Sequence, residues 1–299
     1  MVENIHLKKM DMHVHTRFST EGPDLGVVKV SVNMFGDPVY LYQKAKKIGM
    51  DFVTFTDHNT IDGCLYFLEK MPHADDFMIS EEITTHDPEY KFTIHVNAYD
   101  ITRLQHKRIS KVRGDFHKLI EYLKEQNILY SYNHPYWHRY YDYVLMVPKP
   151  KERLYEIAKN NFSVVEGINS FRLLKQNQLA QEMAQRLGLS MVAGSDAHGG
   201  SIGRAYTMAR ANNLKEFLEE IRQGRTQIAG RHYKFKAMYQ ECLNIFSTNI
   251  NKIKEEYPSR KTTVIANLVS PFVKFCVRRE IKKNTKAQKK IVKTMKKET

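Results

Sequence analysis

The chain has 299 residues, of which 42% are hydrophobic and 27% are charged, and its formal net charge is +14. This composition is ordinary for a globular enzyme, and the length allows one α/β barrel of about 250 residues with an appendage. Three widely spaced cysteines and the lack of any 18-residue apolar run exclude a disulfide framework, a CxxC zinc site and a membrane-spanning helix. Because the N-terminus also has no apolar signal core, we expect a reducing, cytoplasmic location.

The first predicted strand, within residues 5–14, leads into His13 and His15. Residues i and i+2 of a strand point to the same side, so both imidazoles can reach one ion. Two surface histidines are the alternative, since the chain has 13 histidines.

A helix is predicted next, from Asp37 and Pro38 to Lys47, because proline suits a first helical turn and Gly49 follows its end. The β-type run 51–57 then ends in Asp57 and His58, where an Asx turn is the alternative to a ligand pair. A short helix is predicted after Thr60.

Two further strands carry ionisable residues inside them. Glu81 and Glu82 lie within the run 77–85, and neighbours on a strand point to opposite faces, so only one of them can face solvent. His95 lies within the run 92–99, where a single histidine is more often a hydrogen-bonded core residue than a ligand.

The second half continues the alternation of strand and helix. Helices are predicted over 115–126, 173–187 (closed by Gly188) and 213–223, and strands over 128–133, 163–169 and 191–194. The strand 128–133 ends in Asn133, His134 and Pro135, and proline stops a ladder. Asp196 and His198 follow the strand 191–194, again at i and i+2. Repeated βα units of this kind predict a parallel sheet or barrel.

Residues 136–150 are rich in Tyr, Trp and His and show no clear period. We interpret them as a loop or lid beside the site, with His138 as a candidate substrate contact. Ordinary aromatic packing is the alternative.

The basic charge belongs to the C-terminal part of the chain. Residues 231–299 hold 18 of the 47 Lys and Arg and 5 of the 33 Asp and Glu, so their net charge is +13 against +1 for residues 1–230. An apolar stretch, 262–277, broken by Pro271, precedes the lysine-rich run 278–297. This pattern suits a peripheral contact with an anionic membrane or a nucleic acid. The alternative is a helix packed on the main domain with a solvated basic end, and the scarcity of aromatic residues after Phe275 argues against base stacking.

Six predicted strand segments thus carry or end in histidine or carboxylate side chains, which together suit zinc, manganese or iron. In their order they resemble the PHP (polymerase and histidinol phosphatase) family over residues 8–230. The resemblance is carried by His13-x-His15-Thr16, Thr56-Asp57-His58, Glu82-Ile83-Thr84, His95, His134-Pro135 and Ser195-Asp196-Ala197-His198. It implies a distorted (β/α)7 TIM-like barrel over residues 1–230, followed by a basic, mostly helical extension over 231–299.

The resemblance also implies two or three divalent ions (Zn, Mn or Fe) at the C-terminal ends of the strands. His13, His15 and Asp196 would bind the first ion, and Glu82 would bridge it to the second. His95 and His134 would complete the second site. A third ion would take His58 and His198 with Glu21, for which Asp24 is a competitor because this chain is one residue longer there.

The activity implied is hydrolysis of a phosphate ester, either a small phosphomonoester or a nucleotide. Two ions about 3.5–4 Å apart can activate water and bind both oxygens of an in-line displacement. Alternatives are a nuclease or bisphosphate-nucleotide hydrolase of the same family and a non-catalytic metal-binding module.

Four more residues are candidates for catalysis or substrate binding. Asp57 is predicted either to orient a histidine ring or to cap the following helix. Arg204 follows the glycine-containing loop 199–203 and could turn toward the metals. Arg17 and Arg172 are candidate phosphate contacts, with surface ion pairs as the alternative for each arginine.

Overall fold

The computed structural model describes residues 7–19, 36–90, 92–136, 151–197 and 201–231. The predicted loop or lid and the basic C-terminal extension lie outside these residues, apart from their first positions, Tyr136 and Arg231. So do Glu21, Asp24, His138 and His198.

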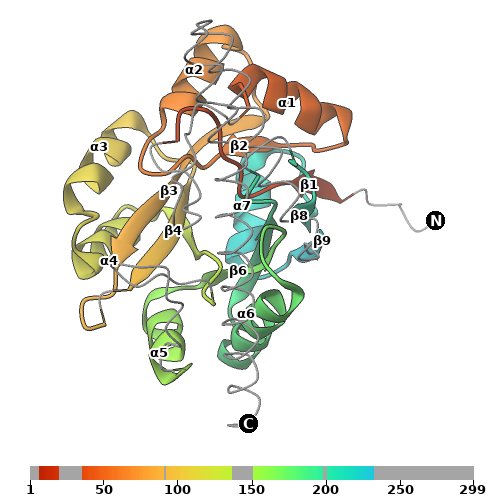
Figure 1. The fold of residues 1–299 in the computed structure, drawn as a ribbon. Coiled ribbons are helices and arrows are strands. Elements are labelled where there is room, and N and C mark those ends of the chain that lie inside the picture. Colours follow the sequence, from red (N-terminus) through yellow and green to blue (C-terminus); the bar gives the residue numbers. More distant parts are fainter. Residues whose placement is uncertain (1–6, 20–35, 91, 137–150, 198–200, 232–299) are drawn as a thin grey trace, which may run out of the picture.

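The fold is built on a six-stranded sheet that curls, so that the architecture is α/β with a curled mixed sheet (Figure 1). Its strands, in spatial order, are β2 (Val53–Phe55), β3 (Phe77–His86), β4 (Thr93–Tyr99), β5 (Leu129–Tyr132), β6 (Val164–Asn169) and β7 (Ser190–Gly194). Neighbouring strands are parallel except at β4, which is antiparallel to both β3 and β5. The prediction of a parallel sheet or barrel was therefore wrong at this strand. No helix separates β3 from β4, and a short connection joins only antiparallel neighbours.

The two edges of this sheet are both paired with the end of β1 (Lys8–Met10) and the segment that follows it. On the β2 side, Met10 bridges Phe52 and the Thr56 amide donates to the Val14 carbonyl, 2.7 Å away. On the β7 side, the Met12 amide donates to the Ala193 carbonyl at 3.2 Å. Residues 10–15 thus form a seam that links the first and last strands of the sheet.

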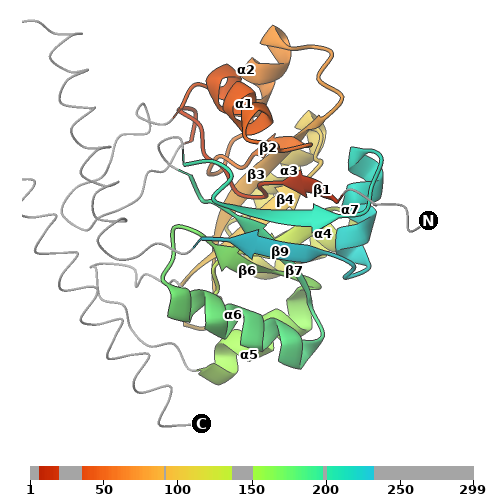
Figure 2. The ribbon, with the colours of Figure 1, turned by 90° about the vertical axis from the view of Figure 1, so that its right-hand side faces the viewer.

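A second sheet of three antiparallel strands was not predicted. It contains β1, β8 (Ala205–Ala209) and β9 (Gln227–Gly230), in the order β1-β8-β9, and lies beside β6 and β7 (Figure 2). These strands are short, and β9 is half-exposed, so their apolar pattern is weak.

Seven helices lie in the described ranges: α1 (Pro38–Lys47), α2 (Asp62–Lys70), α3 (Arg103–Val112), α4 (Phe116–Glu125), α5 (Lys151–Asn161), α6 (Leu174–Leu187) and α7 (Leu214–Arg222). The predictions of α1, α2, α4, α6 and α7 are confirmed. Asp37 caps α1 by accepting hydrogen bonds from two backbone amides, and Gly188 ends α6 with a φ of 67°. None of these helices is long and apolar enough to cross a bilayer.

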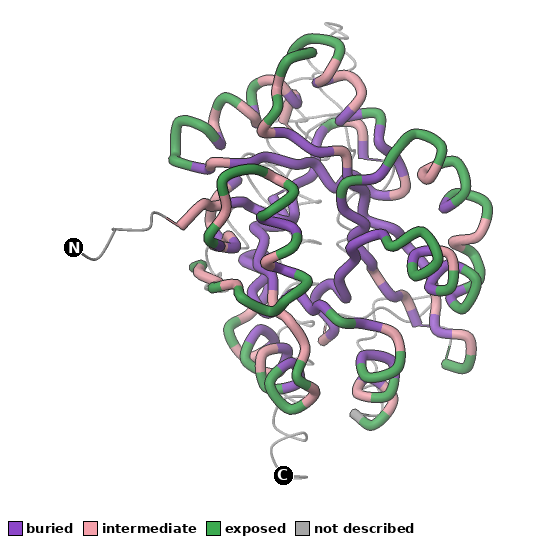
Figure 3. The backbone as a smooth tube through the Cα atoms, turned by 180° about the vertical axis from the view of Figure 1, so that it is seen from behind, coloured by how far each residue is buried: buried purple, intermediate pink, exposed green. Residues whose placement is uncertain are grey.

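The strand ends define two opposite ends of the fold. One end is filled by apolar side chains of α7, among them Phe217 and Ile221, which pack on Phe52, Val164 and Val192 where strands β2, β6 and β7 begin. Buried strands occupy the centre and the helices expose their outer faces (Figure 3). Ligand-type side chains gather at the other end, where the parallel strands finish.

Candidate metal centre

The carboxylate of Glu82 is the centre of a buried cluster of histidines. Its Oε2 lies 3.0 Å from His13 Nε2, 3.2 Å from His15 Nε2 and 3.3 Å from His58 Nδ1. Its Oε1 lies 3.2 Å from both His95 Nδ1 and His134 Nε2. One carboxylate thus faces five imidazoles, divided into two groups by its two oxygens.

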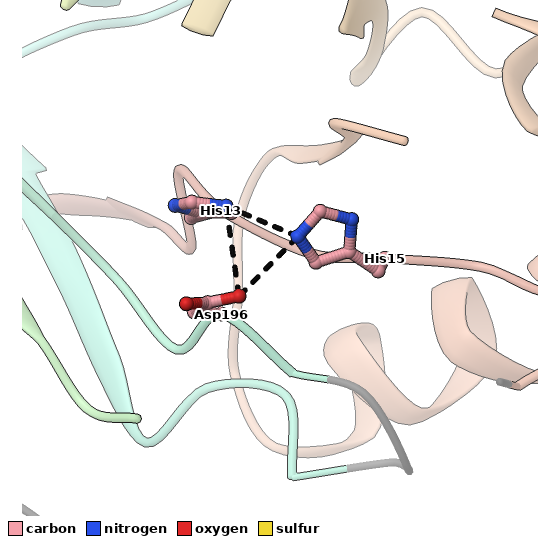
Figure 4. A group of neighbouring side chains, drawn as sticks. All are labelled: His13, His15 and Asp196. Carbon is pink, nitrogen blue, oxygen red and sulfur yellow. Dashed lines mark hydrogen bonds and ion pairs between the residues drawn. The ribbon is translucent and has the colours of Figure 1, made fainter. Parts of the chain in front are cut away.

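The group on the Oε2 side includes Asp196, which comes from the turn after β7. Asp196 Oδ1 lies 3.3 Å from His15 Nε2 and 3.7 Å from His13 Nε2, and the two ring nitrogens are 3.1 Å apart (Figure 4). All three side chains are buried. The backbone links them directly, because the Asp196 amide donates to the His13 carbonyl across the seam at 2.8 Å.

Local backbone geometry explains why these side chains converge. His13 and His15 are two residues apart on the seam, and both point inward. Glu81 and Glu82 are neighbours on β3, so Glu81 points the opposite way and its carboxylate pairs with His106 of α3 at 3.0 Å. His134 and Asp196 have φ angles of 28° and 50°, a conformation that is uncommon outside glycine and often marks functional positions.

Two residues that the sequence interpretation missed support the cluster from β6. Glu166 accepts a hydrogen bond from His13 Nδ1 at 2.9 Å and one from the His134 amide at 2.9 Å. Asn169 Nδ2 donates to Asp196 Oδ2 at 3.1 Å. The signal was present, because a glutamate inside a buried apolar strand needs a partner.

Asn133 was noted only as part of a motif, and it also contacts the centre. Its Nδ2 donates to Glu82 Oε1 at 3.0 Å, and its Oδ1 accepts from Ser131 at 2.9 Å. Ser131 in turn contacts the Tyr99 hydroxyl at 3.0 Å. The interior of the curled sheet behind Glu82 is therefore a polar, hydrogen-bonded network that fixes one orientation of this carboxylate.

Asp57 neither orients an imidazole by a hydrogen bond in the described chain nor caps the following helix, although its Oδ2 lies against Gly63 in the first turn of α2. Both of its carboxylate oxygens accept hydrogen bonds from Thr16, one from the amide and one from the hydroxyl, each at 2.6 Å. The helix-cap alternative was wrong, because α2 begins after Ile61 without a side-chain cap. Asp57 therefore holds the backbone that follows His15, and its catalytic role stays a prediction.

The three predicted arginines occupy different surroundings. Arg172 is buried and its guanidinium lies 3.0 Å from Asp196 Oδ2, within the centre. Arg17 is 41% exposed, forms an ion pair with Asp37 at 3.2 Å and stacks over the rings of Phe18 and Tyr66. Arg204 precedes β8, where its carbonyl accepts a hydrogen bond from the Arg231 amide. The substrate and catalytic roles of these arginines stay predictions.

The carboxylates and imidazoles shift each other's pKa. Burial disfavours charge on Glu82, but His13, His58 and His95 outweigh it and hold the pKa of this carboxyl well below its usual range. Burial likewise opposes charge on His15, but hydrogen bonds to Asp196 and Glu82 raise its pKa to about 8. Burial, with Arg172 nearby, lowers the pKa of His134 to about 4. Protons therefore compete with a metal ion for the ligands on the Oε2 side of Glu82. The ring of His134 is neutral at pH 7, so it can bind a cation without first losing a proton.

This competition predicts opposite effects of pH with and without metal. The pKa of His15 is raised from 6.5 to about 8 in the folded state, so protonation of its ring stabilises the fold. This contribution is at most about 2 kcal/mol, is fully present below pH 6.5 and is lost as pH rises through about 8. In a chelator, the free energy of unfolding should fall over this window; with Mn²⁺ it should rise, because ligands must lose their protons. Urea denaturation at several pH values measures both slopes. The variant His15→Asn should have a shallower metal-free slope, because the raised pKa of His13 also contributes to it. Equal slopes with and without metal would contradict the prediction.

The donor set fits a divalent cation. Because Glu166 accepts a hydrogen bond from His13 Nδ1, the lone pair of His13 Nε2 faces the oxygens of Glu82 and Asp196. Lone pairs that face each other in a buried space repel unless a proton or a metal cation lies among them. Burial opposes charge on His13, but Glu82 and Asp196 raise its pKa well above the usual range, so a proton fills this place when no metal is bound. Ligand atoms about 2.0–2.2 Å from one ion lie roughly 3–3.5 Å apart, which is close to the separations found here. In the described chain, three overlapping groups have all their ligand atoms within 4.8 Å of one another: His13, His15, Asp196; His13, Glu82, His134; and His15, His58, Glu82.

One comparison with known proteins matches a segment of the chain that contributes to this site. Residues 175–226, which include Asp196, match the model of the PHP-associated family (PHP_C), so the resemblance to PHP proteins is confirmed. No curated protein matches the sequence.

Three solved structures are similar in fold. PsfC of Pseudomonas syringae is 14% identical, with a TM-score of 0.51, and the match covers 90% of this chain and 99% of that one. A proposed metal-dependent phosphoesterase of Bifidobacterium adolescentis is 17% identical (TM-score 0.46; 72% and 96% covered). An amidohydrolase of Chromobacterium violaceum, with bound sulfate and no metal, is 12% identical (TM-score 0.46; 74% and 97% covered). At these identities the similarity concerns the fold.

Proposed function

We propose that this protein is a metal-dependent phosphoesterase, built as a distorted (β/α)7 barrel that the seam closes. The observation that carries the proposal is the division of ligands around Glu82. Its Oε2 faces His13, His15 and His58, and its Oε1 faces His95 and His134. A carboxylate whose two oxygens face separate imidazole groups is suited to bridge two ions.

The residues divide between the ions accordingly. His13, His15 and Asp196 would hold the first ion with Glu82 Oε2, and His95 and His134 would hold the second with Oε1. His58 remains for a third ion, together with His198 and Glu21. Zinc, manganese and iron all accept these donors.

The charge of the centre favours a phosphate. Three carboxylates, on Glu82, Asp196 and Glu166, and one guanidinium, on Arg172, give a net charge of about −2 when the histidines are neutral. Two bound divalent cations would make the net charge of the centre positive, and a positive centre attracts the anionic phosphoryl group. The bound ions would polarise the phosphoryl group and lower the pKa of water, so that no nucleophilic side chain is required. Burial raises the pKa of the Cys64 thiol, which makes this described cysteine a poor nucleophile.

The test is a metal analysis followed by a substrate screen. We expect at least two divalent ions per chain, and hydrolysis of p-nitrophenyl phosphate that is lost in a chelator and restored by Mn²⁺ or Zn²⁺. Loss of activity in His13→Ala and Asp196→Ala, with the fold retained, would tie hydrolysis to this centre. Bound metal without turnover of any phosphoester would instead support the non-catalytic metal-binding module.

The net charge of +13 on residues 231–299 favours a second candidate, a nuclease or bisphosphate-nucleotide hydrolase of the same kind. Nucleotides and short oligonucleotides therefore belong in the screen. Turnover of oligonucleotides that weakens steeply with salt would select this alternative over a small phosphomonoester. Vesicles of anionic lipid test the other proposed partner of this segment, and a cytoplasmic location remains part of the proposal.

A further inference from the structure

A bulge in β6 places two polar side chains behind the metal centre. Glu166 pairs with Val192 of β7, but the next pair is Ile168 with Ala193, so Gly167 is an extra residue. Residues three apart on a regular strand point to opposite faces. The extra residue cancels this alternation, and the side chains of both Glu166 and Asn169 reach the centre.

Glu166 accepts three hydrogen bonds in a fully buried position. His13 Nδ1 lies 2.9 Å from Oε1, and Oε2 accepts from the His134 amide at 2.9 Å and from Asn169 Nδ2 at 3.0 Å. The carboxylate therefore connects one residue of the proposed first ion, His13, with one of the second, His134.

Asn169 is itself held in one orientation. Its Oδ1 accepts from the Phe171 amide at 2.9 Å, which turns its Nδ2 toward Glu166 and Asp196. Its backbone amide and carbonyl are both bonded to the side chain of Asn177, at 3.0 and 2.9 Å. The support for the centre is thus rigid over two successive layers of hydrogen bonds.

We propose that Glu166 is a positioning residue that selects the ring tautomer of His13 and so creates the first-ion site. Acceptance at Nδ1 keeps the proton there and leaves the lone pair of Nε2 aimed at the space beside Glu82 Oε2, 3.0 Å away. The inference rests on the proposed function, because it assumes that this space binds an ion.

The variant Glu166→Gln tests the proposal sharply. Glutamine has one acceptor oxygen where three donors converge. If that oxygen keeps the bonds from His134 and Asn169, the amide NH₂ faces His13 Nδ1 and forces the proton onto Nε2, where the ion should bind. We expect the affinity for one ion to fall about 10- to 100-fold while the other ion is retained. Metal content by mass spectrometry and competition with a chromophoric chelator measure this without turnover.

Glu81→Gln is the matched control. Glu81 is as buried as Glu166 and also binds a histidine ring, but it does so on the other face of β3, at His106. We expect its metal content and affinities to equal those of the unaltered protein, with stability alone affected. Equal loss in both variants would show a general effect of removing a buried carboxylate and would overturn the proposal.

A measurement on the unaltered protein guards against a variant that does not fold. Ring ¹⁵N chemical shifts should show His13 with the proton on Nδ1, and the opposite tautomer would overturn the proposal. If the unaltered protein binds no divalent ion, the proposed function fails. If it binds ions and Glu166→Gln binds them equally well, the role of Glu166 alone fails.

Discussion

Replacing Glu82 by glutamine is expected to remove bound metal from both halves of the centre and to lower phosphoester hydrolysis at least about 1000-fold, or about 4 kcal/mol of transition-state stabilisation. The amide would present one oxygen and one NH₂ group where two oxygens now face five imidazoles. One group of histidines would meet a donor in place of an acceptor, and the bridging negative charge would be lost. Metal content and kcat/KM measure the two effects.

Glu81→Gln again provides the comparison, because it makes the same chemical change, from carboxylate to amide, at the adjacent residue and leaves the cluster intact. Its kcat/KM should stay within a few-fold of the unaltered protein. If Glu82→Gln retained full metal content, Glu82 would not be a ligand. If it lost metal but kept its hydrolytic rate, the activity would arise elsewhere.

Gly194→Ala is expected to destabilise the fold by about 3 kcal/mol or more and to disrupt the first-ion group. A Cβ at position 194 would contact the Cβ of His13 and lie 2.6 Å from its backbone nitrogen, closer than real Cβ atoms approach other atoms. The seam cannot easily retreat, because the His13 amide donates to Asp11 and the His13 carbonyl accepts from the Asp196 amide. Relief of the collision must therefore move His13 relative to Asp196.

Urea denaturation and metal analysis measure this effect, and Gly114→Ala serves as the control. A Cβ at Gly114 meets open space, and the φ angle there is not positive. Its free energy of unfolding should change by less than about 1 kcal/mol. A stable, metal-binding Gly194→Ala variant would mean that the seam adjusts more freely than its hydrogen bonds indicate.

Much of the fold followed from local signals. The helix from Pro38 was marked by its cap and by Gly49 beyond its end, and the strand ends were marked by polar residues after β-branched runs. The convergence of His13, His15, Glu82, His134 and Asp196 agrees with what the resemblance to PHP proteins implied, although their binding of metal remains to be measured.

Other features depended on interactions that no local pattern records. Helix α3 was not predicted, because it buries only Ile109 and therefore shows no periodic apolar pattern in the sequence. Reciprocal hydrogen bonds between Thr102 and Gln105 stabilise its first turn instead. The roles of Glu166 and Asn169 depend on an extra residue in β6, and a bulge is set by pairing with β7. Asp57 was expected to serve a ring or a helix, but its partner is Thr16, 41 positions away.

The seam has a consequence for how the protein is made. Asp11 accepts a hydrogen bond from the Ser195 amide, 184 positions further along the chain. Contacts of such long range form slowly, because the loop between them must first be ordered. During synthesis, His13 leaves the ribosome long before Asp196 exists to join it. The newborn chain therefore lacks a complete set of the proposed first-ion ligands until β7, the last strand of the six-stranded sheet, has been translated. Uptake of that ion would then report that the seam has joined the two edges of this sheet.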